Sequence, residues 1–162
     1  MDRVILEKEI RKAFRGVVLG KGMSLGQARV RDRSGEGFPD EDLAKLIPDN
    51  EVKDDWTKID PDQLDNDLCT GYLDAEGFRY YIPALMLSVL DRYIPIDFRV
   101  VSTFSELDAD SDHRKLQYAM LNDAQSRAIA HFLQAAPHLL PLKLGDSERA
   151  SLALQNYWGR YL

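Results

Sequence analysis

Apolar residues recur at helical spacing near the amino terminus. Leu6, Ile10, Phe14 and Val17 repeat every three or four residues, a pattern typical of a helix that buries one face. Asp2 precedes the pattern, and an aspartate in that position caps the first turn by accepting a backbone hydrogen bond. The sequence therefore predicts a first helix that starts beside Asp2.

Other helix starts carry similar local signals. A polar cap followed three residues later by glutamine predicts helices after Ser24 and after Asn122. We expect Pro137 to end the second of these two helices. Asp60 followed by Pro61 predicts a helix through residue 68. The last helix is predicted to start at residue 146, from the helical spacing of its apolar positions.

The middle of the chain changes period. Residues 68–73 and 78–82 are predicted to be two short strands around a turn closed by Gly77, because apolar and polar positions alternate over 78–82. Pro83 is expected to begin the next helix and Pro95 to end it. The pattern leaves residues 96–104 open between an edge strand and an extended loop.

These elements predict a mainly α fold. We expect one compact domain over residues 1–162, with about five to seven helices around one central β-hairpin. A chain of 162 residues buries roughly 70% of the surface that its unfolded form exposes, so it needs no disulfide or metal to fold. The single cysteine, Cys69, excludes an internal disulfide.

No apolar run approaches the roughly 18 residues of a membrane-spanning helix, and the amino terminus lacks the apolar core of a signal peptide. We therefore expect a soluble, cytoplasmic protein that does not bind membranes.

Negative charge is concentrated in one segment. The chain has a formal net charge of -6, but residues 49–76 alone hold ten acidic and two basic side chains. Such a segment is often only a solvated face; as a functional surface, it would attract a basic partner. It argues against nucleic-acid binding, which needs basic residues and aromatic platforms.

Motifs that resemble catalytic or metal sites are incomplete. Gly22-Met23-Ser24-Leu25-Gly26 matches a nucleophile elbow, but it follows a helix and not the strands that such a motif requires. The run 108–112 resembles a calcium loop, but Ala119 stands where the bidentate glutamate belongs. We therefore predict no catalytic residue, cofactor or metal ligand, and no enzyme activity, although an unrecognised activity stays open.

Three separated blocks carry a family resemblance. They contain a Trp-x-x-Ile entry, a Gly-Phe-Arg-Tyr-Tyr-x-Pro-Ala core with a later glutamine-led helix, and a terminal Tyr-Trp. The matching positions are Trp56, Ile59, Gly77, Phe78, Arg79, Tyr80, Tyr81, Pro83, Ala84, Gln125, Phe132, Leu133, Tyr157 and Trp158. On these positions the chain resembles a bacterial family of uncharacterised proteins. The resemblance implies that Arg79 and Gln125 hold a buried polar framework, with a ligand site as the alternative.

Two functional hypotheses follow. The first is a protein-binding module, a small acidic inhibitor of the immunity type that neutralises a basic toxin or effector. Its partner-binding residues would be Asp54, Asp55, Asp60, Asp62, Asp65 and Asp67. The alternative is a small-molecule-binding protein or unrecognised enzyme, with a pocket beside the hairpin. That pocket would be lined by Tyr72, Arg79, Tyr81 and Trp158. A domain whose role depends on its genomic context is a third possibility.

Overall fold

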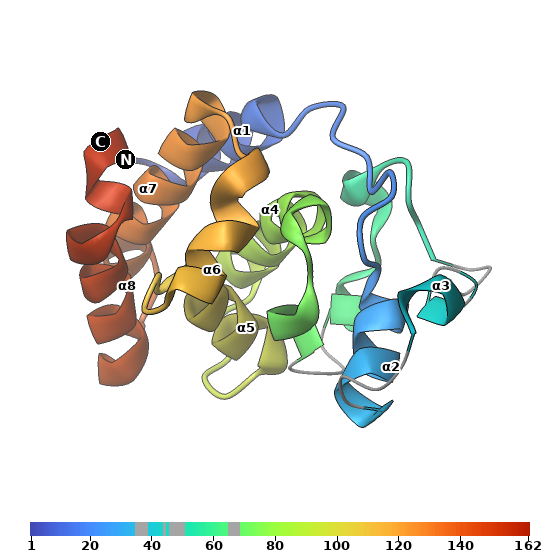
Figure 1. Cartoon of the computed structure of the whole chain (residues 1–162). Helices are drawn as coiled ribbons and strands as arrows, with labels where there is room; N and C mark the ends of the chain where they lie inside the picture. Colours follow the sequence, from blue (N-terminus) through green and yellow to red (C-terminus); the bar gives the residue numbers. More distant parts are fainter. Residues whose placement is uncertain (35–38, 44, 46–50, 65–68) are drawn as a thin grey trace.

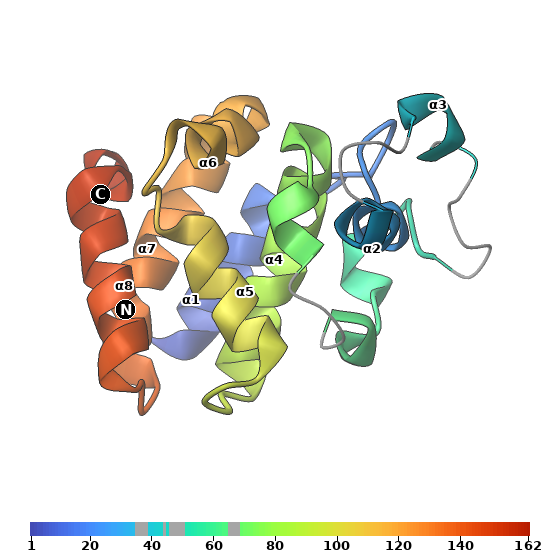
Figure 2. The same cartoon turned by 60° about the horizontal axis from the view of Figure 1, so that its bottom comes forward.

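Helix α4 (Ala75–Asp91) runs through the centre of the molecule, and other helices pack around it. The computed structural model describes residues 1–34, 39–43, 45, 51–64 and 69–162. Figures 1 and 2 show α7 and α8 on one side of α4 and α2 and α3 on the other. Over the described residues the chain forms α-helices and short 3₁₀ helices and contains no strand.

The helices follow one another with short connections. The other α-helices are α1 (Arg3–Ala13), α2 (Leu25–Ser34), α3 (Asp40–Leu43), α5 (Phe98–Leu107), α6 (Asp112–Gln117), α7 (Asp123–Leu139) and α8 (Leu144–Asn156). The 3₁₀ helices are η2 (Trp56–Lys58), η3 (Pro61–Leu64), η4 (Cys69–Tyr72), η5 (Tyr118–Met120) and η6 (Trp158–Tyr161). The prediction of a mainly α fold is therefore confirmed.

The predicted central β-hairpin is wrong. The turn and the second predicted strand belong to α4, and residues 69–72 of the first form η4. Helix α4 is buried around most of its circumference, so its apolar residues do not follow a single helical stripe. The alternation of apolar and polar positions over 78–82 arises because residues on nearly every side of this helix are buried. Pro83 lies inside α4 and does not begin a helix.

Several boundaries differ from those predicted. Pro137 lies inside α7, which continues to Leu139. The pattern leaves residues 96–104 open between an edge strand and an extended loop, but residues 98–104 belong to the helix α5, which continues to Leu107. The helix predicted from Asp60 through residue 68 is η3, which ends at Leu64, and residues 65–68 lie outside the described part of the chain. Among the described helices, none combines the length and the apolar composition needed to span a bilayer.

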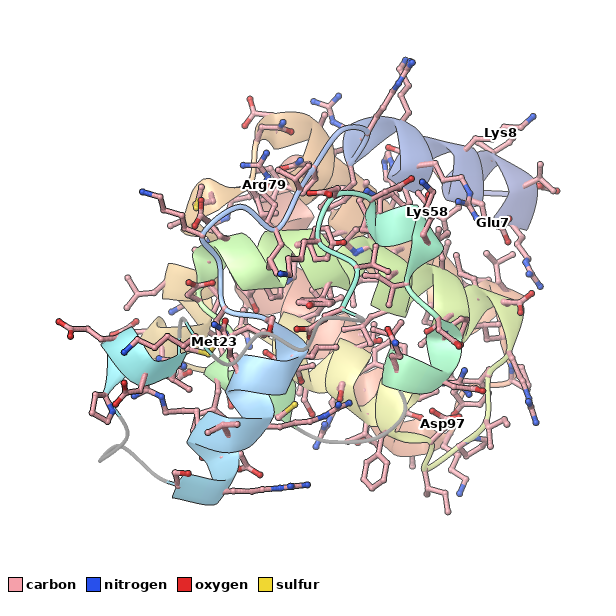
Figure 3. All side chains as sticks on the ribbon, turned by 90° about the vertical axis from the view of Figure 1, so that its right-hand side faces the viewer. Glu7, Lys8, Met23, Lys58, Arg79 and Asp97 are labelled. Carbon is pink, nitrogen blue, oxygen red and sulfur yellow. The ribbon has the colours of Figure 1, made fainter. Side chains whose placement is uncertain are left out.

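One carboxylate fixes the amino-terminal end of α4. Oδ1 of Asp74 accepts hydrogen bonds from the backbone N–H of Gly77 at 2.8 Å and of Met23 (labelled in Figure 3) at 3.0 Å. It therefore caps α4 and holds the loop before α2 against it. A Cβ atom on Gly77 would lie 2.4 Å from the Met23 carbonyl oxygen, and one on Gly22 would lie 2.6 Å from the Cβ of Glu76. Both glycines are required by this close approach.

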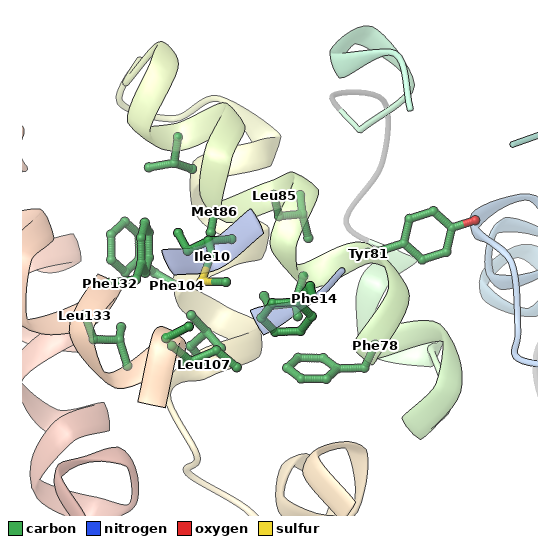
Figure 4. Close-up of a cluster of buried hydrophobic side chains, with 14 of the residues drawn as sticks. Ile10, Phe14, Phe78, Tyr81, Leu85, Met86, Phe104, Leu107, Phe132 and Leu133 are labelled. Atoms are coloured by element: carbon green, nitrogen blue, oxygen red, sulfur yellow. The ribbon is translucent and has the colours of Figure 1, made fainter. Parts of the chain in front are cut away.

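Beyond this end, α4 packs into the main core. Figure 4 shows Phe14 of α1's carboxyl end, Met86 of α4 and Phe104 of α5 in one buried cluster. The rings of Phe104 and Phe132 stack with centroids 6.0 Å apart. Tyr81 leaves α4 in another direction, towards α2. Helix α4 therefore joins the core to the elements that carry the acidic segment.

A buried ion pair joins η4, α5 and α6. Glu106 is buried, accepts a hydrogen bond from the Thr70 hydroxyl at 2.9 Å and pairs with Arg114. Burial raises the pKa of Glu106 above its ordinary value, and the charge of Arg114 and the bond from Thr70 offset part of that rise. The Tyr118 hydroxyl donates to the backbone carbonyl of Glu106 at 2.6 Å.

We predict that Gly22→Ala and Gly77→Ala each lower the free energy of unfolding by about 2–3 kcal/mol, because the added methyl group meets backbone or Cβ atoms at less than 3 Å. Gly145→Ala is the matched control, since it adds a methyl group in open space within a helix and should be neutral or stabilise by up to about 1 kcal/mol. Urea denaturation measures all three variants. Equal effects at the three positions would contradict the close approach.

We predict that Glu106→Gln changes how stability depends on pH. Because the native pKa of Glu106 is raised, the native state holds the proton to higher pH than the unfolded state, whose glutamate pKa is about 4.3. The stabilisation from this titration is fully present below the pKa of the unfolded state. It is lost as the pH rises through the pKa of Glu106 in the native state. The unfolding free energy of the wild type minus that of Glu106→Gln should therefore fall as pH rises above about 4.3.

Urea denaturation of both proteins between pH 4 and pH 7 measures this difference. Glu41→Gln removes a charge from an exposed position and is the control. A difference that rises with pH would mean that the Arg114 charge outweighs burial.

Candidate functional site

The acidic segment is attached to the core at several points. The indole Nε1 of Trp56 donates to the Phe14 carbonyl at 2.9 Å, and the side chain is only 3% exposed. The Tyr80 hydroxyl donates to the Val52 carbonyl at 2.8 Å, and the backbone N–H of Leu19 donates to the Lys53 carbonyl at 2.8 Å. Residues 51–59 are therefore held against both α4 and the chain that follows α1.

Four of the six predicted partner-binding aspartates belong to the described residues. Asp54, Asp60 and Asp62 are exposed, and the side chain of Asp55 is about two-fifths exposed. Asp65 and Asp67 lie outside the described part of the chain. The anchored segment thus carries exposed carboxylates on both sides of its buried tryptophan.

The acidic residues at the start of this segment all raise the pKa of Tyr80. Burial raises the pKa of the Tyr80 hydroxyl, and the negative charges of Asp55, Asp54 and Glu51 raise it further. The pKa of Asp55 is lowered, first by the hydrogen bond from the Thr57 hydroxyl at 2.6 Å and by that from the Thr57 backbone. Asp55 therefore stays ionised.

Part of the negative charge is balanced locally. Lys58 Nζ lies 3.4 Å from the carboxylate of Asp55, and both side chains remain accessible to solvent. Asp62 lines a pocket of about 370 Å³ together with Arg11, Arg92 and Arg99. Asp91 lines the same pocket and Arg99 pairs with Asp97, so the acidic segment meets side chains of both charges on the side of α1 and α4. Its exposed carboxylates include Asp54 and Asp60.

The residues of the predicted alternative pocket lie in different places. Tyr81 is buried; its hydroxyl accepts from the Leu25 N–H at 3.3 Å and lies 3.4 Å from Glu51 Oε1. Trp158, the first residue of η6, is buried against Tyr118 of η5, and its Nε1 donates to the carbonyl of Leu107 at the end of α5 at 2.8 Å. Both side chains are thus engaged in packing.

Tyr72 is the member of that group that lines a pocket of about 760 Å³, whose walls do not include Arg79, Tyr81 or Trp158. Tyr72 is 43% exposed there, beside Lys21 and His113. Arg79 is partly buried, and its Nε has no hydrogen-bond partner in the part of the chain that the structure describes. Gln125 is buried and completes the capping box of α7 with Asn122.

The described residues contain no group of three or more side chains placed to hold a metal ion. His131 lies 2.9 Å from both carboxylate oxygens of Glu9 and joins α7 to α1.

Sequence reasoning did not single out the turn between α4 and α5. Ile96 at its tip is 82% exposed, and Phe98 beside it is 43% exposed. Arg92 and Arg99, which flank this turn, line the same pocket of about 370 Å³ as Asp62. Pro95 could have indicated a turn, but no local pattern shows which side chain a turn exposes.

Comparison with known proteins gives a family and no nearer relative. A family model described as "Family of unknown function (DUF6714)" matches residues 2–162. No curated protein and no solved structure was found to match the chain.

Proposed function

The chain belongs to this family of unknown function, and we propose, from its own residues, that it is a protein-binding module whose acidic segment contacts a basic partner. The partner is a toxin or effector that the chain neutralises in the bacterial cytoplasm, in the manner of an immunity protein. The main support is the anchored segment 51–64, which displays Asp54, Asp60 and Asp62 to solvent.

Rigid display of charge favours association with a protein. Trp56, Ile59 and Leu64 are buried within the segment, so forming a complex does not require ordering of the chain at these positions. Clustered carboxylates accelerate encounter with a positive surface and disfavour polyanions. A basic surface of the kind that binds phosphate groups in a nuclease has the matching charge.

We predict that Asp54→Asn, Asp60→Asn and Asp62→Asn in one variant slow association with the partner about tenfold at low salt, because rim charges act mainly on the association rate. Asparagine keeps the acceptor with which Asp60 binds the Asp62 N–H. The partner is first recovered with the tagged chain from its own cells, identified by mass spectrometry and purified. Stopped-flow or surface plasmon resonance then gives the rates at several salt concentrations.

The matched control changes three exposed aspartates elsewhere, Asp110→Asn, Asp112→Asn and Asp123→Asn. It alters the net charge equally and should change the association rate much less. Co-expression of the chain with the partner should restore growth if the partner is toxic. If both triple variants associate like the wild type, or the recovered protein is not basic, the proposal is wrong.

A second candidate function is small-molecule binding in the pocket of about 760 Å³, whose volume lies within the range of ligand sites. Its lining combines an exposed tyrosine ring with Lys21 and His113, a set that suits an anionic ligand. Calorimetric titration with inorganic phosphate and with AMP tests this function. Millimolar or tighter binding that Lys21→Ala abolishes would favour it over the protein-binding module.

A further inference from the structure

The connection between α4 and α5 is a tight turn with an isoleucine in a glycine position. The backbone N–H of Asp97 donates to the Ile94 carbonyl at 3.1 Å, with Pro95 and Ile96 as the two central residues. Ile96 has a φ of 70°. A turn with proline first and a positive φ second is of type II, and its second central position favours glycine or asparagine.

Ile96 is unfavourable in this position. Left-handed backbone is strained for a residue with a branched Cβ, and glycine would adopt it without that strain. The side chain gains little from the fold in return, since it is 82% exposed. The fold needs the turn, but it does not need the isoleucine side chain.

The turn is firmly held at its carboxyl side. Asp97 caps α5 by accepting from the Arg99 backbone N–H at 2.9 Å. Its carboxylate also pairs with the Arg99 guanidinium at 2.6 Å, and both side chains are more than nine-tenths buried. Ile96 is therefore presented on a fixed backbone, so binding through it loses little conformational entropy.

The turn between α4 and α5 lies close to η3 of the acidic segment. Asp62 and Pro61 of η3 share the walls of one pocket with Arg92 and Arg99, which flank the turn. An exposed apolar anchor beside polar and charged residues matches the arrangement of a protein interface, with an apolar centre and a charged rim.

We propose that Ile96, with Phe98 beside it, is the apolar anchor that inserts into a pocket on the basic partner, next to the surface that meets the acidic segment. This inference rests on the proposed protein-binding function and adds the second half of the interface. The exposed carboxylates of Asp62 and Asp91 line the same pocket as the two arginines that flank the turn, and one of these arginines, Arg99, is paired with Asp97. These exposed carboxylates favour such a partner over an anionic membrane, which they would repel. They also disfavour a second copy, since a two-fold contact would bring the acidic segments together.

Ile96→Asn tests the anchor without removing the turn, because asparagine tolerates the left-handed conformation. The melting temperature should stay the same or rise, and the Kd for the purified partner should weaken by at least about tenfold. Leu116→Asn, at an exposed leucine on α6, is the matched control and should leave the Kd unchanged. A benzophenone amino acid introduced at position 96 should also cross-link to the partner in cells, whereas at position 116 it should not.

Three outcomes overturn the inference, and the results for the acidic triple variant and for Ile96→Asn together separate it from the proposed function. An unchanged Kd for Ile96→Asn excludes the anchor, and a cross-linked product of two copies of this chain assigns the turn to self-association. Binding to phosphatidylglycerol vesicles that Ile96→Asn abolishes would assign it to a membrane. If the acidic triple variant loses association while Ile96→Asn binds normally, this inference fails and the proposed function stands. If only the acidic variant binds normally, the electrostatic proposal fails and the anchor stands.

Discussion

The fold depends on the close approach of two backbones at the start of α4. Oδ1 of Asp74 accepts from Gly77 in its own helix and from Met23 in the loop before α2. This approach is possible because neither Gly22 nor Gly77 has a side chain. It fixes where α4 begins and brings α2 against it. The direction of α4 then sets the positions of its aromatic residues towards the acidic segment and towards the core.

The acidic segment depends on α4 as well. Tyr80 binds the Val52 carbonyl, and Tyr81 reaches Glu51 and the start of α2. These hydroxyls are the polar ends of side chains whose rings are buried, so one pair of adjacent tyrosines both packs the core and supports the segment. The segment is therefore a surface built on the core, although its charge makes it resemble a solvated loop.

The proposed interface combines two features with different physical roles. The carboxylates of the acidic segment act over several ångströms and are screened by salt, so they govern encounter. Ile96 acts only in contact, so it governs how long a complex lasts. One pocket is lined both by Asp62 of the acidic segment and by Arg92 and Arg99, which flank the turn that carries Ile96. An inhibitor needs both properties, because it must find its target quickly and release it slowly.

The sequence by itself determined where α1, α2 and α7 begin, because local hydrogen bonds fix a helix start. Asp2 and the capping boxes that begin at Ser24 and Asn122 all lie where the pattern predicted, because a cap involves residues only three positions apart.

Tertiary structure decided that residues 75–91 form a helix and where the candidate site residues lie. Burial of α4 on nearly all sides removes the contrast between faces on which helical periodicity depends, so the alternation at 78–82 resembled a strand. For the same reason, no sequence pattern could show that Trp158 packs away from Tyr72 or that Ile96 is left in solvent.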